Sequence, residues 1–289
     1  MKKSELKLLT YNVGLARAVL FGRSYEPMPH VEARSRCLPQ TLMSLNADIV
    51  ALQEIYEHGH RSQLAQALAD LYPFTSTFDI QSLLGVNDGL MLLSKFPIAD
   101  PEFVAFKASL IDDSLFTRKG FTRCRIDTPL GEITAFNVYT AAGGLFRHPE
   151  RPNIDAVRQL QLDQLTESCG TAGGSHLILL GDFNTGPQVS PSNYASLLHR
   201  GFVDTYAVTD HADGEPEVTW DPRNPLNVDS PHRMCPPQRI DHVMLHERSL
   251  KKLHIKSSRI VAHEHTIPIP TGQNVTPSDH YGLLTILEG

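Results

Sequence analysis

Short apolar runs of strand length recur through the whole chain, and helical segments lie between several of them. The runs have the length and the β-branched or aromatic content of strands, and they are residues 6–13, 47–55, 89–96, 121–127, 132–140, 176–184, 239–246 and 282–288. Apolar residues at three- and four-residue spacing predict helices over 60–71, 153–168 and 31–46. Pro39 is expected to break the last of these. The mixture predicts an α/β protein with layered sheets and helices outside them.

One domain is expected over residues 1–289, because neither a linker nor a shift in composition divides the chain. A hydrophobic content of 41% suits a sizeable core. The formal net charge of −6 argues against a uniformly basic surface for nucleic acid. Residues 207–238 are irregular and rich in Pro, Asp and Asn. A loop of that length in a compact domain is usually either functional or mobile.

The cellular compartment of the chain is predicted only from two missing features, a signal peptide and a membrane-spanning run. The first residues, MKKSELKLLTYNV, are interrupted by charges and carry no signal-peptide core, and no run approaches the ~20 apolar residues that span a bilayer. We therefore expect a cytoplasmic chain, with peripheral membrane contact or secretion without a classical signal left open. Reduced thiols without metal-site spacing are expected at Cys37, Cys124, Cys169 and Cys235.

Several apolar runs end in polar residues, and this pattern is typical of a shared site. Ligand sites in α/β proteins gather at strand ends. Each residue alone also has a structural explanation, as a turn former or a solvated strand end. Five such ends in one chain are harder to explain in that way. The residues are Asn12, Gln53, Glu54, Asp182, Asn184, Asp241, Asp279 and His280.

The chemistry of these residues predicts a reaction at a phosphorus atom. Asn12, Glu54 and Asp279 are hard oxygen ligands of the kind that Mg²⁺ takes. His280 is suited to acting on a water molecule or to binding a phosphoryl oxygen, with a nearby carboxylate fixing its tautomer.

Two further polar residues would assist the attack. Asp182 and Asn184 are two residues apart on an extended segment, so both are expected to point to one side and to hold an attacking water. The predicted reaction class is metal-assisted displacement at phosphorus.

At this point the chain resembles the endonuclease/exonuclease/phosphatase superfamily. The motifs TYN at 10–12, LQE at 52–54, GDFN at 181–184, RIDH at 239–242 and SDH at 278–280 match in order. LLSKFPI at 92–98 is also similar to a recurrent family segment. The resemblance implies a four-layer α/β sandwich of two packed mixed β-sheets flanked by helices. It also implies phosphoester cleavage that depends on Mg²⁺, with Mn²⁺ as the alternative ion and no organic cofactor.

The resemblance also implies roles for individual residues. It places Asn12, Glu54 and Asp279 at the metal site. It makes Asp182 and Asn184 the residues that orient the nucleophile. It makes His280 the catalytic histidine and Asp241 its carboxylate partner.

Three weaker features are similar to the neutral sphingomyelinase-like branch of this superfamily. They are RKG at 118–120, TWDPRNPLN at 219–227 and SDHYG at 278–282. Lys119 of the first would contact a phosphate, and a solvated lysine in a basic loop is the alternative.

The chain departs from the family pattern at one position. Many members place a leaving-group histidine where this chain has Ala141 and Ala142. Tyr139, Thr140 or Arg147 are the polar residues that would replace it.

Apolar residue pairs in expected loops favour a lipid substrate over nucleic acid. These pairs are Leu20–Phe21, Leu83–Leu84, Leu115–Phe116 and Leu145–Phe146, and packing of the loops on the core is the alternative explanation. Basic residues nearby do not form a continuous run. We therefore expect a phospholipid headgroup phosphodiesterase with peripheral membrane contact. The alternatives are an abasic-site or DNase-like nuclease, a phosphoinositide phosphatase, or a catalytically weakened binding module.

Overall fold

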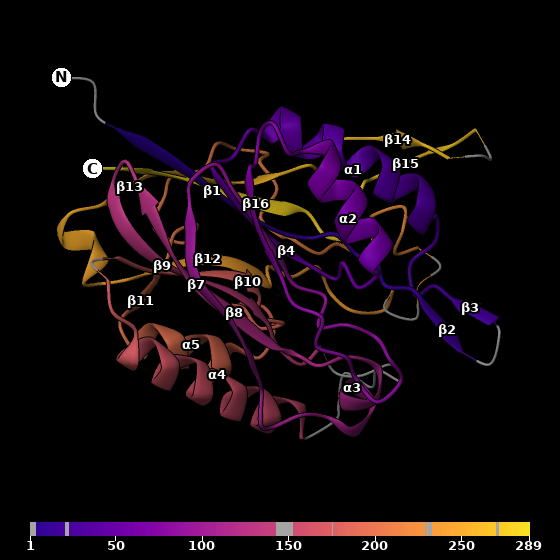
Figure 1. Cartoon of the computed structure of the whole chain (residues 1–289), viewed down its shortest axis with the longest axis horizontal. Helices are drawn as coiled ribbons and strands as arrows, with labels where there is room; N and C mark the ends of the chain where they lie inside the picture. Colours follow the sequence, from indigo (N-terminus) through magenta and orange to yellow (C-terminus); the bar gives the residue numbers. More distant parts are fainter. Residues whose placement is uncertain are drawn as a thin grey trace.

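Two six-stranded β-sheets lie face to face, and helices cover the outer face of each (Figure 1). The computed structural model describes residues 4–20, 23–142, 153–174, 176–228, 230, 233–269 and 272–289. The four layers confirm the predicted α/β sandwich of two mixed sheets. Phe21, Leu145, Phe146 and Arg147, which the sequence singled out, lie outside the described residues.

Each sheet combines parallel and antiparallel neighbours. The first sheet runs β13 (His254–Val261), β16 (Gly282–Glu288), β1 (Glu5–Asn12), β4 (Ile49–Gln53), β6 (Met91–Ser94) and β5 (Phe74–Thr77). The second sheet runs β11 (Phe202–Asp204), β12 (Asp241–His246), β10 (His176–Asp182), β9 (Gly131–Tyr139), β8 (Gly120–Thr128) and β7 (Ile98–Ala105). Two small hairpins pair β2 (Ala18–Leu20) with β3 (Arg23–Tyr25), and β14 (Ile267–Pro268) with β15 (Asn274–Val275).

The helices bury their apolar stripes on the outer faces of the sheets. Leu38 and Leu42 of α1 (Val31–Leu45) and Leu64 of α2 (His58–Ala67) pack against the first sheet. Residues of α4 (Ile154–Thr171) and α5 (Pro191–His199) pack against the second. The remaining helical segments are α3 (Ile111–Phe116) and the 3₁₀ turn η1 (Ser249–Lys251). None of the helices in the described ranges has both the length and the apolar character that crossing a membrane requires.

The main core lies between the two sheets. Leu8 and Ile49 of the first sheet meet Ile178 and Val243 of the second, and each of these side chains is 1% exposed or less. Burial on that scale stabilises the fold by about 1.5–3 kcal/mol for each aliphatic side chain. β10 is buried on both faces, as its continuous apolar run predicts, because the sheet packs on helices behind it and on the first sheet in front.

The strand directions bring several strand ends to one edge of the sandwich. β1 and β4 are parallel in the first sheet, and β9 and β10 are parallel in the second. Parallel neighbours end at the same edge of a sheet, so their carboxyl ends lie together. β12 is antiparallel to β10 and begins at that edge, where Asp241 pairs with Asp182. The fold therefore gathers the polar strand ends that the sequence singled out.

A buried amide pair joins the two sheets beneath this edge. Gln53 Nε2 of β4 donates to Asn137 Oδ1 of β9 at 2.7 Å. Asn137 Nδ2 donates in turn to the carbonyl oxygens of Leu52 at 3.0 Å and Met91 at 3.2 Å. Asn137 is 1% exposed, so each of these bonds satisfies a group that water does not reach. The pair fixes the spacing of the sheets where the site is built.

Several sequence expectations need correction. Pro39 does not break its helix, because α1 continues through it to Leu45. A proline removes one backbone hydrogen bond, and the buried stripe on either side of Pro39 holds this helix to the sheet. The expected helix 60–71 is α2, which ends at Ala67. β13, β7 and α5 were not predicted, since β13 and β7 lack a continuous apolar run and α5 spans only nine residues.

Candidate active site

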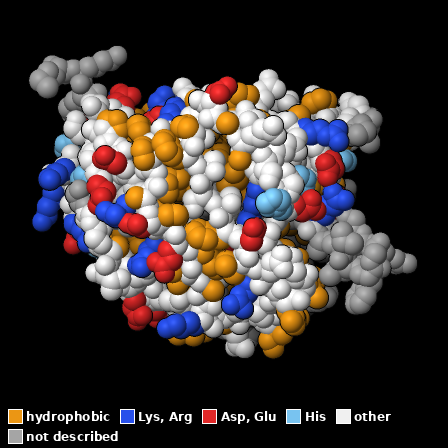
Figure 2. Space-filling model, in the orientation of Figure 1, with side chains coloured by type: hydrophobic (Ala, Val, Ile, Leu, Met, Phe, Trp, Pro, Cys, Tyr) orange, Lys and Arg blue, Asp and Glu red, His pale blue; other side chains and the backbone are white. Residues whose placement is uncertain are grey.

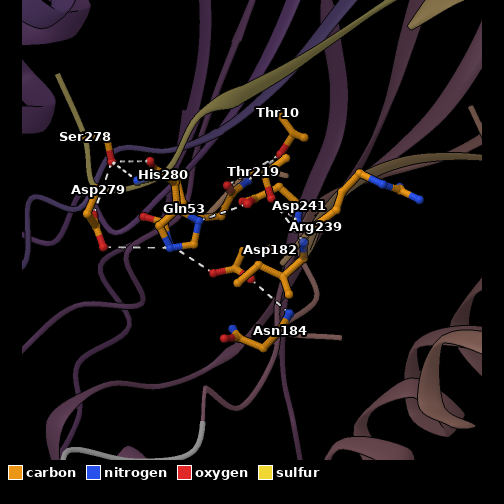
Figure 3. A network of polar contacts seen from close by, with 12 residues as sticks. Thr10, Gln53, Asp182, Asn184, Thr219, Arg239, Asp241, Ser278, Asp279 and His280 are labelled. Atoms are coloured by element: carbon orange, nitrogen blue, oxygen red, sulfur yellow. Dashed lines mark hydrogen bonds and ion pairs between the residues drawn. The ribbon is translucent and has the colours of Figure 1, made fainter. Parts of the chain in front are cut away.

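Polar side chains from both sheets converge at the edge where the strands end (Figure 3). Asn12 ends β1 and Glu54 follows β4 in the first sheet. Asp182 ends β10 and Asp241 begins β12 in the second. Figure 3 shows Asp182 and Asp241 pointing toward His280, which lies two residues before β16. The residues predicted from the sequence therefore share one location.

Asn12 connects the acidic groups of the two sheets. Its Nδ2 donates to Glu54 Oε1 at 3.1 Å and to Asp182 Oδ2 at 3.0 Å. Its Oδ1 accepts the backbone N–H of Gly14 at 3.0 Å, so the amide oxygen faces the backbone here. Asn12 is fully buried and acts in this geometry as a donor between two carboxylates.

Glu54 adopts a backbone conformation that is unusual for its type. Its φ is +61°, in the left-handed region, which costs a non-glycine residue about 1–3 kcal/mol and is found repeatedly at functional sites. The Glu54 carbonyl accepts the N–H of Leu15 at 3.0 Å. The Tyr139 hydroxyl donates to Glu54 Oε1 at 2.5 Å. These bonds hold the carboxylate within reach of Asn12.

His280 and Asp241 form a buried hydrogen-bonded pair. His280 Nδ1 lies 2.9 Å from Asp241 Oδ2, and the two side chains are 8% and 0% exposed. Burial alone would lower the pKa of His280. The carboxylates of Asp241, Asp279 and Asp182 outweigh that effect and raise the pKa to about 10. The Nδ1 atom of His280 is engaged by Asp241, and Nε2 is the ring nitrogen not bonded to Asp241.

Asp182 and Asn184 combine local capping with a place in the site. Asp182 Oδ1 accepts the N–H of Asn184 at 2.9 Å, so the loop does cap itself. Asp182 Oδ2 nevertheless accepts from Asn12, as described above. Burial raises the pKa of Asp182 to about 6, and the neighbouring Asp241 charge adds to this rise. Asn184 has φ +47° and donates to the Thr140 carbonyl at 3.2 Å.

Lys119 lies beside the site and is not a solvated residue of a basic loop. It is 6% exposed, whereas the neighbouring Arg118 is exposed. Its Nζ donates to the Thr140 carbonyl at 2.8 Å and lies 3.4 Å from the centre of the Tyr139 ring. A cation over an aromatic face is stabilised most strongly when both are shielded from water.

Ala141 stands where many family members have a histidine, and its backbone groups are hydrogen-bonded. Ala141 donates its N–H to Gln161 Oε1 at 2.8 Å, and its carbonyl accepts from Arg158 at 3.0 Å. The hydroxyl of Tyr139 is engaged by Glu54, and that of Thr140 donates to the Phe183 carbonyl. Two cationic side chains therefore lie at this position: Arg158 on the Ala141 carbonyl, and Lys119 on the Thr140 carbonyl beside Tyr139.

Asp279 rests against Gly14, and both are tied by Arg34. A Cβ atom on Gly14 would lie 2.3 Å from Asp279 Oδ1, and φ is +56° there, so glycine is required. The fully buried Arg34 donates to the carbonyls of Val13 at 3.0 Å, Gly14 at 2.6 Å and Pro277 at 3.3 Å. Burial raises the pKa of Asp279 above its usual range. No pattern in the sequence indicated this role for Arg34.

The donor set fits a metal cation. Asp182, Asp241 and His280 each place a ligand atom within 4.8 Å of the others and could hold a metal ion. Asp241 Oδ1 is buried and accepts no hydrogen bond from the described residues. Glu54 and Asp279 add further oxygen atoms, and the charge of Glu54 helps to raise the pKa of Asp279. Crowded carboxylates of this kind are stabilised by a cation.

The irregular segment 207–238 braces the site from outside. Asn224 Nδ2 donates to the carbonyl of Ser278 at 3.0 Å, and Asn227 Nδ2 donates to that of Asp279 at 3.2 Å. Thr219 contacts the same segment and the start of β12. The sequence motif at 219–227 includes Thr219, Asn224 and Asn227, but no pattern within the motif predicted these contacts.

Other histidines lie elsewhere. His263 and His265 are half-buried in a bend after β13, where His265 Nε2 lies 3.0 Å from Ser44 Oγ. His242 is fully buried and bonded to Asp204 and to the Thr185 carbonyl.

Sequence and fold comparisons identify the family and the fold of the chain. Residues 9–280 match the model of the Endonuclease/Exonuclease/phosphatase family. The chain belongs to this family. Members of the endonuclease/exonuclease/phosphatase family are metal-dependent phosphoesterases. No curated protein sequence matches the chain.

Several solved structures share this fold. Sphingomyelinase C from Streptomyces griseocarneus has a TM-score of 0.74 at 21% identity over 98% of this chain and 99% of that one. A mutant beta toxin from Staphylococcus aureus with bound magnesium ions has a TM-score of 0.74 at 18% identity, with 98% and 99% covered. D. rerio TDP2 complexed with a single-strand DNA product has a TM-score of 0.70 at 17% identity, with 99% and 100% covered. At these identities the likeness shows that this family member shares their fold.

Proposed function

We propose that this chain is a magnesium-dependent phosphodiesterase that hydrolyses the headgroup phosphodiester of a phospholipid, in the manner of a neutral sphingomyelinase. The observation that carries the proposal is the His280–Asp241 pair beside Asp182, all buried at one edge of the sandwich. The likeness in fold to sphingomyelinase C supports the choice of substrate class.

The reaction forms a bond from a water oxygen to phosphorus and breaks the bond from phosphorus to the leaving alcohol. Asp182 and Asn184 orient the water, and Asp182 accepts its proton, a role suited by a pKa of about 6 near the working pH. His280 donates a hydrogen bond from Nε2 to a phosphoryl oxygen, since Asp241 occupies Nδ1. The departing oxygen takes up a proton from solvent, and Asp182 then releases to solvent the proton that it accepted from the water, which balances the step.

Glu54 and Asp279 would hold Mg²⁺, with Mn²⁺ as the alternative ion, and Asn12 would lie beside the ion with its amide oxygen on the Gly14 N–H. When bound, the ion would polarise a phosphoryl oxygen as a Lewis acid. The carboxylates of Glu54 and Asp279 supply the negative charge, and Asn12 keeps Glu54 in position.

We assign to Lys119 the electrostatic stabilisation of the leaving oxygen, in place of the histidine that the chain lacks. The ammonium group is fixed by the Thr140 carbonyl and the Tyr139 ring, so it needs no rearrangement during the reaction. Its burial strengthens its interaction with a developing negative charge.

Exposed apolar residues favour a lipid substrate. Leu83 and Ile111 are 83% and 82% exposed. The loop of Leu83 is joined to α3, the helix that begins at Ile111, by the N–H of Leu84, which donates to the Leu115 carbonyl at 3.4 Å. These apolar residues are connected to the site through Thr117, which lies two residues before Lys119. The Thr117 hydroxyl donates to the Asn87 carbonyl and so ties the segment before Lys119 to the segment after Leu83. On the face in Figure 2, basic and acidic side chains are intermingled without a continuous basic track for nucleic acid. We infer peripheral membrane contact through Leu83 and Ile111.

The test is a panel of phosphoesters with Mg²⁺ and with chelator. Sphingomyelin vesicles, lysophospholipid, phosphoinositide, abasic DNA and a generic soluble phosphodiester are offered in turn. We expect phosphocholine release from sphingomyelin that stops with chelator and returns with Mg²⁺. A Glu54→Ala variant is the negative control.

Other outcomes would replace the proposal. Cleavage of abasic DNA without phosphocholine release would make the chain a nuclease, which its likeness in fold to TDP2 with DNA product also allows. Release of inorganic phosphate from phosphoinositide would make it a phosphatase. Binding of a phosphoester without turnover of any member of the panel would make it a binding module.

A further inference from the structure

The two members of the His280–Asp241 pair depend on different sheets for their positions. Asp241 is the first residue of β12 in the second sheet. His280 precedes β16, which belongs to the first sheet. A shift of one sheet end relative to the other would change the 2.9 Å contact between His280 Nδ1 and Asp241 Oδ2.

Thr219 bonds to both sides of this junction. Its Oγ1 accepts the backbone N–H groups of Ile240 and Asp241, each at 3.1 Å. Its carbonyl oxygen accepts the N–H of Tyr281, the residue after His280, at 2.6 Å. Thr219 itself is 0% exposed, so water does not compete for these bonds. Figure 3 shows Thr219 close to Asp241 in the network around His280.

The neighbouring residue makes this connection a short piece of sheet. Trp220 forms antiparallel bridges with Gln238 on one side and with His280 on the other. Thr219 and Trp220 thus act as a two-residue strand between the start of β12 and the segment before β16. The side-chain amides of Asn224 and Asn227, farther along the loop, hydrogen-bond to the same segment before β16.

We propose that Thr219 is a positioning residue that fixes the relative placement of Asp241 and His280. The inference rests on the proposed phosphodiesterase function for its activity readout, but not for its structural one. Misplacement of a catalytic group by about 1 Å can cost on the order of 100-fold in rate, so loss of the Thr219 hydroxyl should appear in kcat.

The experiment compares Thr219→Val with Thr219→Ser. Valine keeps the shape but leaves the N–H groups of Ile240 and Asp241 without an acceptor, whereas serine keeps the hydroxyl. Thr205→Val is the matched control. Thr205 is also fully buried, and its hydroxyl also links β12 to the first sheet, through the Val243 carbonyl at 3.0 Å and Thr285 Oγ1 at 2.9 Å.

Two readouts are measured on the full-length protein. The first is kcat and KM for a soluble phosphodiester, bis(p-nitrophenyl) phosphate, with Mg²⁺. The second is the NMR signal of the His280 Nδ1 proton in the metal-free protein, assigned with a His280→Gln variant. Circular dichroism confirms that each variant is folded, and Thr219→Ala takes the place of Thr219→Val if that variant is not.

We expect Thr219→Val to lower kcat on the order of 10- to 100-fold with KM changed less than about threefold. The His280 signal should shift or disappear in this variant. Thr219→Ser should retain both kcat and the signal, and Thr205→Val should retain both even where it lowers stability. The inference is overturned if Thr219→Val keeps the His280 signal, or if Thr205→Val lowers kcat as much. A wild-type protein that hydrolyses no phosphodiester would defeat the proposed function, and the NMR signal would still decide the inference.

Discussion

His280 Nδ1 and Asp241 Oδ2 lie 2.9 Å apart although the two residues are anchored in different sheets of the sandwich. The contact exists because the antiparallel strands β10 and β12 meet at the edge where the first sheet also ends. It fixes one ring nitrogen of His280 and directs the other toward the remaining acidic groups, with Nε2 4.0 Å from Asp279 Oδ2.

Replacing Asp241 with asparagine should impair His280 while preserving the shape of the site. Removing the Asp241 charge removes a main cause of the raised His280 pKa, so that pKa should fall in the metal-free protein. We expect kcat to fall on the order of 10²- to 10⁴-fold, the usual value of acid–base assistance. An NMR titration of His280 and steady-state kinetics check the two effects. Asp100→Asn, at an exposed carboxylate, is the control, and an unchanged kcat in Asp241→Asn would remove the pair from the reaction.

Removing one carboxylate should weaken the binding of the metal. Glu54→Gln keeps the size of the side chain and its contact with Asn12 but loses the negative charge. Calorimetric titration with Mg²⁺ should show weaker binding, and activity should require more Mg²⁺ for half-maximal rate. Glu102→Gln changes an exposed carboxylate on β7 and should leave both unchanged. Equal Mg²⁺ affinity in Glu54→Gln and wild type would place the ion elsewhere, for example among Asp182, Asp241 and His280.

The strand-end residues could be predicted from the sequence because each breaks an apolar run abruptly. Asp182 and Glu54 are such cases, and parallel strand directions then bring them together. Asn137 could not be predicted in this way, since it lies inside a strand and its partners come from the other sheet.

Contacts made by loops were also beyond prediction. Thr219 and Asn227 bond to Tyr281 and Asp279, which lie 62 and 52 positions away in the sequence, and they do so from a segment without periodicity. For Lys119, the sequence was equally consistent with a phosphate-binding residue and with a solvated lysine. Its burial is decided by the Tyr139 ring beneath it, which is a tertiary contact.

Polar substitutions at the exposed apolar tips should separate membrane binding from chemistry. The double variant Leu83→Ser, Ile111→Ser removes two apolar side chains that are more than 80% exposed. We expect weaker binding to sphingomyelin vesicles in a sedimentation assay, with unchanged kcat on a soluble phosphodiester. Leu160→Ser, at a residue 57% exposed on α4, is the matched control and should bind vesicles normally. Normal vesicle binding by the double variant would show that these two side chains do not contact lipid.

A second buried charge network lies on the side of the second sheet that faces α5. Asp204 Oδ2 accepts from Arg239, from the Tyr194 hydroxyl at 2.8 Å and lies 3.1 Å from His242 Nδ1. Burial alone would raise the pKa of Asp204. The neighbouring His242 and Arg239 outweigh it and hold that pKa well below its usual range.

The Asp204 network should stabilise the fold at neutral pH and lose that effect in acid. The folded pKa of Asp204 is below the unfolded value of about 3.9, so the unfolded state binds the proton more readily. The stabilisation is therefore complete well above pH ~4 and declines as the pH falls through the folded value. Asp204→Asn should lower the free energy of unfolding by about 3–5 kcal/mol at neutral pH, because Arg239 stays buried without its partner charge. Urea unfolding from neutral pH downward should show the gap from wild type narrowing below pH ~4. Asp210→Asn, at an exposed position, should show no such gap, and a gap for Asp204→Asn that widens in acid would contradict the assigned direction of the pKa shift.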